Sequence, residues 1–422
     1  MKRSMAILAA SVLLLSACGR DDGGDGGTGA PGVTKEACPN AVNKDNGCIY
    51  LGTISDLTVG PFKALAVPIT KAQEMFWKRV NTQGGIGGYD IDVTKYVRDN
   101  KYSPETHTQV YQEIKGKVLA IAQTLGSPTT AAVIDDMRTN KVVATPASWT
   151  SLWNFEDVIL ESGAPYCIES MNAVDYAIET VKPKSVMAVH NPGDYGGDAA
   201  AGAKYAAETN KLTFSDVETP PGQENQGRAI EAIVKNKPDL VILTAGPTDT
   251  AVIVGEAAAR GYKGRFIGTG PTWNPGLIAS PAAPALKGLY WQSAPWMPFQ
   301  TDTPGHKAMR DALGTGIGAP NDGYTAGWVW SYPLKAALTK AAADKDLTRD
   351  GLLKAVKSLT TVDYEGMLTG GNYAGDATTG AVRTTVIGAP DDTAPTKIKI
   401  IKEAFTGPTA KGYALSKPCF QA

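Results

Sequence analysis

The chain of 422 residues is poor in histidine and has no excess of basic side chains, which are the groups that many metal sites and nucleic-acid sites depend on. It has only three histidines, and no two of them have the spacing of a metal-binding pair. Its 41 basic and 42 acidic residues give a net charge of −1, which provides no positive field for nucleic acid. We therefore expect no metal, no cofactor and no nucleic-acid partner.

Long apolar runs are also missing, except for one short run at the N-terminus. Residues 5–15 are apolar, follow a basic start and are too few to span a bilayer, which is typical of an export signal. The sequence LSACG at 15–19 resembles the bacterial lipobox, whose cysteine is acylated. We predict a lipoprotein signal peptide at 1–17 and an extracytoplasmic protein held at the membrane by lipid on Cys18. The alternative is a free cysteine after a plain signal peptide.

The segment after this cysteine, residues 18–34, is rich in Gly and Asp. Apolar side chains that could offset the entropy of ordering are scarce there. The composition therefore predicts a flexible tether between the lipid and the folded body.

Cysteine is scarce, and four remain in the mature chain beyond the lipobox. An even number outside the cytoplasm indicates disulfides, and four cysteines allow three pairings. We favour Cys38–Cys48, which would close a small loop at the start of the fold, and Cys167–Cys419, which would fix the C-terminus. The alternative is that some of these cysteines stay reduced and buried.

Most of the chain alternates strand-like and helical patterns, and it does so twice. The strands predicted in the first part are 48–54, 89–93, 118–122 and 142–144. Their order with the intervening helices, β-α-β-α-β-α-β, implies a mostly parallel sheet with helices on both faces. The pattern begins again from about Ala164, with predicted strands at 185–190, 212–217, 239–245 and 265–268.

A chain of this length favours two domains. We predict an α/β fold of two doubly wound parallel-sheet lobes, joined by a hinge, with a ligand cleft between them. The first lobe is expected at 35–164 plus about 295–365, and the second at 165–294 plus about 366–422. The predicted strand ends face the cleft, and ligands of open α/β sheets bind beyond the carboxyl ends of the strands.

One turn in the first lobe has the features of an anion site. Ser127 and Pro128 follow the strand at 118–122 and begin a helical pattern. Serine is a good N-cap, and proline suits the first position of a helix. The free N–H groups of such a helix favour a carboxylate or a phosphate. The alternative is an ordinary capped helix.

Five sequence blocks stand out by their order and spacing: AQEMFWKRVNTQGGIGGYDIDV, LGSPTTAAV, VVATPAS, VHNPGDYGGD and LVILTAG. Together they resemble the type 1 periplasmic binding proteins of ABC importers, and most of all the leucine/isoleucine/valine-binding kind. The resemblance extends from about Cys48 to the C-terminus. It implies a monomeric receptor that closes like a hinge on a small-molecule ligand, delivers it to an ABC permease and performs no chemistry.

The resemblance also assigns roles to single residues. Ser127 is expected to hold the ligand carboxylate together with Ala147 and Ser148, and Tyr195 is expected to lie over the ligand. Trp149 stands where a smaller hydroxyl residue is common. The complete expected ligand-binding set is Ser127, Thr129, Thr130, Ala147, Ser148, Trp149, Tyr195, Gly246, Asp249, Gly270 and Trp273.

Two features of the resembled family are missing. Gly246 and Gly270 occupy the positions of a second-lobe aromatic residue and of the acid that pairs with a ligand ammonium. A buried ammonium without an anion is costly. Asp249 is a candidate replacement for that acid, or else a normal residue of a helix N-terminus. An ordinary branched-chain amino acid is therefore not the expected ligand.

Tryptophans near the predicted cleft favour a flatter or less polar ligand. Trp149 and Trp273, if they face the cleft, suit an aromatic acid, a short amide or a similar carboxylate, and packing is the alternative for each. Trp153 and Trp296 are weaker candidates. The aromatic residues of the predicted long helix at 323–343 are expected in the core.

Other functions agree less well with the sequence than a solute receptor does. A sensory receptor of the same fold differs only in its partner, and a purely structural surface lipoprotein implies a cleft that binds nothing. A hydrolase needs a catalytic motif, and the sequence has no G-x-S-x-G, no zinc motif and no P-loop. His190, at a predicted strand end, is expected to be structural. We expect no enzymatic activity.

Overall fold

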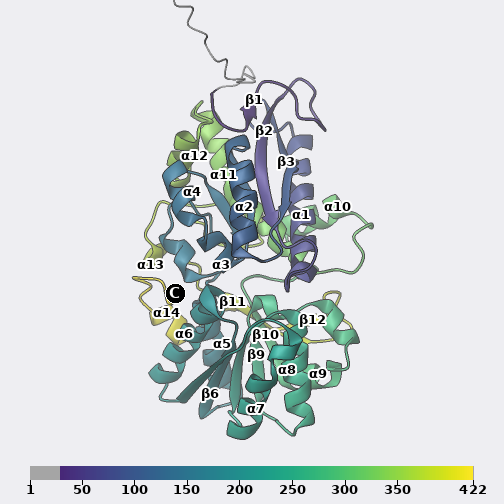
Figure 1. Ribbon diagram of the computed structural model, residues 1–422, viewed down its shortest axis with the longest axis vertical. Coiled ribbons are helices and arrows are strands. Elements are labelled where there is room, and N and C mark those ends of the chain that lie inside the picture. The colour runs from purple at the N-terminus through teal and green to yellow at the C-terminus, as the bar shows by residue number, and fades with distance from the viewer. Residues whose placement is uncertain (1–28, 422) are drawn as a thin grey trace, which may run out of the picture.

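The computed structural model describes residues 29–421, which form two α/β lobes stacked along the long axis of the molecule (Figure 1). In the first lobe, four strands form a parallel sheet in the order β3-β2-β4-β5. They are β2 (Gly47–Ser55), β3 (Tyr89–Asp99), β4 (Ala120–Leu125) and β5 (Ala144–Ala147). The short β1 (Val33–Thr34) pairs antiparallel with the start of β2. The predicted signal peptide and Cys18 lie outside the described residues.

Helices from two separate parts of the chain surround this sheet (Figure 1). The N-terminal half provides α1 (Lys63–Thr82), α2 (Pro104–Ile114), α3 (Ser127–Ala131) and α4 (Ile134–Asn140). The C-terminal half provides α10 (Pro304–Leu313), α11 (Asp322–Ala343) and α12 (Arg349–Val356). The first lobe is therefore completed by chain that follows the second lobe.

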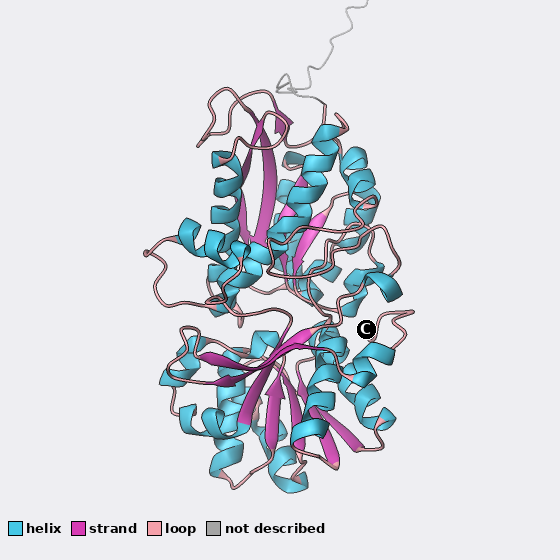
Figure 2. Ribbon diagram, turned by 180° about the vertical axis from the view of Figure 1, so that it is seen from behind, coloured by secondary structure: helices cyan, strands magenta, loops and turns pink. Residues whose placement is uncertain are grey.

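The second lobe contains a larger sheet with helices on both faces (Figure 2). Its strand order is β12-β11-β10-β9-β8-β6-β7, parallel from β10 to β7 and antiparallel at β11 and β12. The strands are β6 (Ser185–His190), β7 (Thr213–Glu218), β8 (Leu240–Thr244), β9 (Arg265–Gly268), β10 (Tyr290–Ala294), β11 (Thr385–Pro390) and β12 (Ile398–Phe405). The predicted α/β fold of two parallel-sheet lobes is confirmed.

The helices of the second lobe again come from two parts of the chain. They are α5 (Tyr166–Thr180), α6 (Gly193–Thr209), α7 (Gly227–Asn236), α8 (Pro247–Ala259), α9 (Ala283–Leu289) and α14 (Pro408–Gly412). The short α13 (Ala377–Gly380) contacts the turn at Ser151–Phe155 of the first lobe. Short 3-10 turns occupy Lys115–Lys117, Ser151–Phe155, Gln223–Asn225, Gly270–Thr272 and Pro275–Ala279.

Among the described residues of both lobes, no helix is both long and apolar enough to cross a membrane.

Aromatic packing ties the two halves of the first lobe together. Phe76 lies on the buried face of α1. The centroid of its ring is 5.1 Å from that of Trp328 and 4.9 Å from that of Tyr332, both on α11. Edge-to-face pairs of this kind stabilise a core beyond the area that they bury. These two aromatic residues of α11 lie in the core, as expected.

The N-terminal segment is ordered earlier than predicted. Val33 and Thr34 form β1, and the backbone N–H of Tyr50 donates to the carbonyl of Gly32 at 2.7 Å. The side chain of Val33 is buried. The prediction of a flexible tether that reaches Thr34 is therefore wrong, because the start of β2 pairs with this segment and one valine reaches the core.

The helix after β4 also differs from the prediction. Gly126, not Ser127, is its N-cap residue, and helix α3 ends after five residues. Gly126 has φ 99°, a conformation that favours glycine, and a Cβ there would lie 2.5 Å from Oγ1 of Thr129. The prediction of Ser127 as the cap is wrong, and its hydroxyl is free of any capping role.

Both favoured disulfides, Cys38–Cys48 and Cys167–Cys419, are present. The first joins the segment before β2 to β2 itself. The second joins α5 to the C-terminal segment, which lies between the two lobes at the side of the molecule (Figure 1).

Candidate functional site

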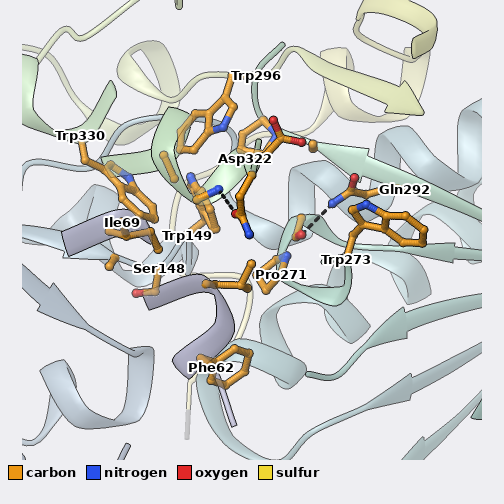
Figure 3. A pocket seen from close by; sticks show the side chains of 18 of the residues that line it. Phe62, Ile69, Ser148, Trp149, Pro271, Trp273, Gln292, Trp296, Asp322 and Trp330 are labelled. Carbon is orange, nitrogen blue, oxygen red and sulfur yellow. Dashed lines mark hydrogen bonds between the residues drawn. The ribbon is translucent and has the colours of Figure 1, made fainter. Parts of the chain in front are cut away.

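A pocket lined by residues of both lobes lies at the carboxyl ends of strands from both sheets, and Figure 3 shows the side chains of its wall. It encloses about 1000 Å³ not filled by protein atoms, including its open mouth. The end of β4 leads to Ser127 in the wall, the end of β5 to Ser148 and Trp149, and the end of β9 to Gly270. This is the position where the α/β topology favours a ligand.

Aromatic side chains dominate the wall of the pocket. The ring of Trp149 lies 4.7 Å from that of Trp330 and 5.1 Å from that of Trp296. Phe62 of the first lobe and Tyr195 of the second meet across the cleft, with their ring centroids 5.8 Å apart. Because aromatic rings offer large apolar contact areas, this wall favours a ligand with an apolar body.

Few polar side chains interrupt this wall, and no Lys, Arg or His is found among its described residues. Oγ of Ser127 is buried and has no hydrogen-bond partner within the described chain. Oγ of Ser148 accepts a hydrogen bond from Nε1 of Trp153 at 2.8 Å, so its own hydrogen remains available to a ligand. A buried hydroxyl without a partner is destabilising, and a polar ligand group at Ser127 would remove that cost.

Two acids flank the pocket, of which Asp322 is half-buried and Glu169 is fully buried. Asp322 lines it at the start of α11, where its Oδ1 accepts from the backbone N–H of Phe299 at 2.8 Å. Burial raises the pKa of Asp322 to about 6, although that hydrogen bond acts in the opposite direction. Behind the wall, Oε1 of Glu169 accepts from the N–H of Gly270 at 2.7 Å, and burial raises the pKa of Glu169 well above its usual value. Asp322 was not singled out in the sequence analysis, because it enters the pocket from a helix that none of the five sequence blocks covers.

The positive groups of the pocket are helix N-termini. The first turns of α1, α5, α6 and α11 contribute to the wall Leu65, Tyr166, Tyr195 and Asp322. Several N–H groups of these first turns are already paired, such as that of Tyr166 with the carbonyl of Trp149 at 2.7 Å and that of Gly323 with Oδ1 of Asn321 at 2.7 Å. What these termini offer the pocket is the partial positive charge of the helix dipole. In a wall without basic side chains, these termini are the groups that suit a carboxylate.

The model of the periplasmic binding protein family matches residues 49–392. The chain belongs to this family. The predicted resemblance to type 1 periplasmic binding proteins of ABC transporters is thereby confirmed. Members of the family are extracytoplasmic substrate-binding proteins rather than enzymes, and they work with an ABC permease.

Solved structures extend this similarity. The chain is 31% identical to a fatty acid ABC transporter substrate-binding protein from Thermomonospora curvata, with a TM-score of 0.84, over 92% of this chain and 97% of that one. It has the fold of a branched chain amino acid ABC transporter from Thermus thermophilus with bound valine, at 17% identity, a TM-score of 0.72 and coverage of 87% and 98%. It also has the fold of a leucine binding protein from Thermotoga maritima, at 16% identity, a TM-score of 0.71 and coverage of 85% and 99%. No curated protein matches the chain.

This periplasmic binding protein brings most of the predicted ligand-binding residues together. Those that line the pocket are Ser127, Ala147, Ser148, Trp149, Tyr195, Gly270 and Trp273. Of the weaker candidates, Trp296 lines the pocket as well, whereas Trp153 lies behind the wall and positions Ser148.

The remaining predicted residues lie outside the pocket wall, contrary to expectation. Thr129 and Thr130 are buried, and their hydroxyls bond to oxygens of the β4–α3 turn. Gly246 precedes α8, and a Cβ at this position would lie 3.6 Å from the backbone oxygen of Pro61 in the other lobe. Oδ2 of Asp249 accepts from the N–H of Gly222 at 3.0 Å, so this acid holds a neighbouring loop rather than a ligand.

Several pocket residues escaped the sequence analysis. They are Phe62, Leu65, Ile69, Tyr102, Tyr166, Gln292, Asp322 and Trp330. Trp330 was expected only in the core, and it serves both the core and the pocket wall. The sequence did contain a signal for two of them. Phe62 and Tyr166 stand at the starts of helices that follow strands, and such helix starts were a usable guide to the pocket wall.

The structure offers little to a hydrolase. His190 ends β6 but does not line the pocket. Its Nδ1 is 2.9 Å from the next backbone carbonyl, and its Nε2 is 3.8 Å from a carboxylate oxygen of Asp216. The one group of metal-ligand type among the described residues is Cys167, Asp198 and Cys419, and both sulfurs there belong to a disulfide.

Proposed function

We propose that this periplasmic binding protein captures a carboxylate with an apolar body and delivers it to an ABC permease. The observation that carries the proposal is the pocket wall, which is largely apolar and aromatic and has few polar side chains. Such a wall suits a ligand with a large apolar body and one small polar end. Fatty acids and aromatic acids have this form. The 31% identity to a protein named as a fatty acid ABC transporter substrate-binding protein supports the same class.

The polar end of the ligand is assigned to the first lobe. The unpartnered hydroxyl of Ser127 and the available hydrogen of Ser148 are both donors in the wall. Hydrogen bonds to a charged group are stronger than those between neutral groups. Helix N-termini around the pocket add partial positive charge in place of a basic side chain.

We infer that binding closes the two lobes, divided at 35–164 plus about 295–365 and 165–294 plus about 366–422. Contacts already join the lobes across the cleft. Nδ2 of Asn274 donates to the carbonyl of Ala64 at 3.3 Å, and the rings of Phe62 and Tyr195 meet. A ligand that touches both lobes favours the closed state by its higher affinity for that state.

The remaining parts of the proposal concern the membrane. Residues 1–17 are proposed to be removed, and lipid on Cys18 then holds the mature protein outside the cytoplasm. The protein acts as a monomer that presents its closed form to the permease. The sequence around the cysteine, LSACG, supports the anchor.

A thermal-shift panel tests the ligand class. A ligand at 100 times its Kd adds about 2.7 kcal/mol to the free energy of unfolding. Apolar carboxylates are expected to raise the melting temperature, and Ser127→Ala should weaken their binding by roughly 10- to 100-fold, the worth of one hydrogen bond to a charged group. Ser293→Ala is the matched control, because Ser293 has a buried unpartnered hydroxyl outside the pocket wall. Shifts from amino acids or sugars alone would contradict the proposal.

A second candidate is an amino-acid-like ligand, and the position of Asp322 favours it. Its carboxylate lines the pocket and would pair with a ligand ammonium. Asp322→Asn separates the two candidates. The substitution should weaken binding of an ammonium-bearing ligand, because its anion is gone, and should strengthen or preserve binding of a simple carboxylate, because a like charge is gone.

A further inference from the structure

The pocket continues from the cleft onto one face of the second sheet. Cross-strand register pairs Ala294 with Val386, Gln292 with Gly388, and Gly388 with Ile400. Directly paired residues point to the same face of a sheet, and so do residues two apart along one strand. These positions on β10, β11 and β12 therefore share one face, and all of them line the pocket.

We define the tail groove as the part of the pocket lined by Trp273, Gln292, Val386, Gly388, Ile398 and Ile400. Trp273 packs against the strands beside the groove and is held from two sides. The ring of Trp273 stacks on Tyr290 with the centroids 5.6 Å apart, and its Nε1 donates to the carbonyl of Thr396 at 3.2 Å. A side chain fixed in this way makes a rigid wall.

The floor of the tail groove is apolar. A Cβ at Gly388 would lie 2.3 Å from Cγ2 of Ile398, so a side chain at this position would displace the isoleucine. None of the six groove residues is charged, and the acid beside them is Asp322, whose carboxyl bonds to the side chain of Thr396, the residue whose carbonyl accepts from Trp273. Its one polar side chain is Gln292, whose Nε2 already donates to the carbonyl of Gly270 at 2.8 Å. The occupant that fits such a surface is a hydrocarbon chain.

The groove and the serine hydroxyls lie at different ends of the pocket. Figure 3 shows Ser148 and Trp273 on opposite sides, with Pro271 between them. Ser127 and Ser148 belong to the first lobe, whereas the groove belongs to the second lobe, where β10, β11 and β12 carry most of it. A ligand that reaches both ends must be long, and a compact amino acid would leave the groove empty.

We propose that the tail groove binds the aliphatic tail of a straight-chain carboxylate, and that Val386 and Ile400 set the chain length that the protein accepts. This inference rests on the proposed function, since it places the carboxylate at Ser127. The strands β11 and β12 thereby act as a selectivity element, although they lie far along the chain from the residues that hold the carboxylate.

A chain-length series of saturated acids tests the groove. Affinities of the mature protein for hexanoate, octanoate, decanoate and dodecanoate are measured by titration calorimetry. Affinity should rise by about fourfold per added methylene while the tail gains contact with the groove, which is the fold-change that burial of one methylene produces. Ile400→Phe narrows the groove and should lower dodecanoate affinity by at least about tenfold, the worth of some two methylenes. Hexanoate affinity should stay within about twofold of the wild-type value, since a short chain ends before the groove.

Ile401→Phe is the matched control. Ile401 neighbours Ile400 on the same strand, but its side chain is 40% exposed and points away from the pocket. It should leave every affinity unchanged. Equal dodecanoate affinity in wild type and Ile400→Phe, with hexanoate still bound, would overturn the groove and leave the carboxylate proposal standing. Failure of every acid to bind the wild type would overturn both.

A crystal structure with dodecanoate brominated at its terminal carbon gives a second measurement that does not depend on a variant. Anomalous scattering locates the bromine. The inference expects it beside Trp273 and Ile398. Bromine among Trp149, Trp296 and Trp330 would place the tail at the other end of the pocket and overturn the assignment.

Discussion

At the scale of single residues, the pocket depends on side chains whose polar atoms are left free or are held in an unfavourable charge state. Ser127 keeps an unpartnered hydroxyl inside an apolar wall. Asp322 sits in the same wall with a pKa raised to about 6 by burial. Both arrangements cost stability, and both become favourable only when a ligand group meets them.

The raised pKa of Asp322 predicts how the stability of the folded protein depends on pH. Because the pKa of Asp322 is higher in the folded protein, at about 6, than its ordinary value of 3.8, the folded state holds this proton more tightly. Its contribution is therefore most favourable below pH 4 and is lost as pH rises towards and past 6. Asp322→Asn keeps an oxygen acceptor for the N–H of Phe299 and removes the charge.

We expect Asp322→Asn to raise the free energy of unfolding at pH 7.5, by on the order of 1–3 kcal/mol, and to have little effect at pH 3.5. Urea denaturation at the two pH values measures the difference. An equal effect of the substitution at both pH values would show that the charge of Asp322 is not the cause.

Some pocket residues could be predicted from the sequence because they are polar residues within recognisable motifs. Ser127 and Ser148 stand in motifs of the resembled family, and both line the pocket. Phe62 and Trp330 gave no such signal. An apolar residue on a buried helix face looks the same in sequence whether it meets another helix or an empty cavity, and only the assembled lobes distinguish the two cases.

At the scale of secondary structure elements, polar residues inside strands limited the prediction. The run at 118–122 was predicted as the strand, and β4 is instead Ala120–Leu125. Its later residues include Gln123, whose Nε2 donates to Oγ of Ser55 at 2.7 Å, and Thr124, whose hydroxyl is 2.8 Å from that of Thr130. These buried polar residues are satisfied by partners on other elements, which an apolar pattern does not reveal.

A second prediction concerns the contribution of β1 to the stability of the fold. A protein that starts at residue 35 lacks β1, the buried Val33 and the carbonyl of Gly32 that accepts from Tyr50. Compared with one that starts at residue 29, it should lose about 2–4 kcal/mol of stability, the sum of one buried valine and a few strand hydrogen bonds. Chemical denaturation measures the loss.

Two valines provide the control for this experiment. Val33→Ala should lower stability, because Val33 is 5% exposed, whereas Val59→Ala should be neutral, because Val59 is 75% exposed. Equal stability of the two truncated forms would show that the segment before residue 35 contributes nothing to the fold.

At the scale of the whole molecule, alternation of strands and helices was enough to predict two parallel-sheet lobes, because parallel strands need crossover helices. The pocket was harder to predict. Its wall draws on the ends of both sheets, on α11 and on the antiparallel strands β11 and β12. These parts meet only because the chain passes from one lobe to the other and back. No local sequence pattern indicates which of their faces will meet.

Titration calorimetry with decanoate tests the central claim, that the pocket between the lobes binds an apolar carboxylate. The account predicts one decanoate per protein, with a negative heat-capacity change because apolar surface is buried. It also predicts weaker binding to Ser127→Ala and unchanged binding to Ser293→Ala. Absence of binding by decanoate and by aromatic acids, in a protein that does bind leucine, would contradict the account.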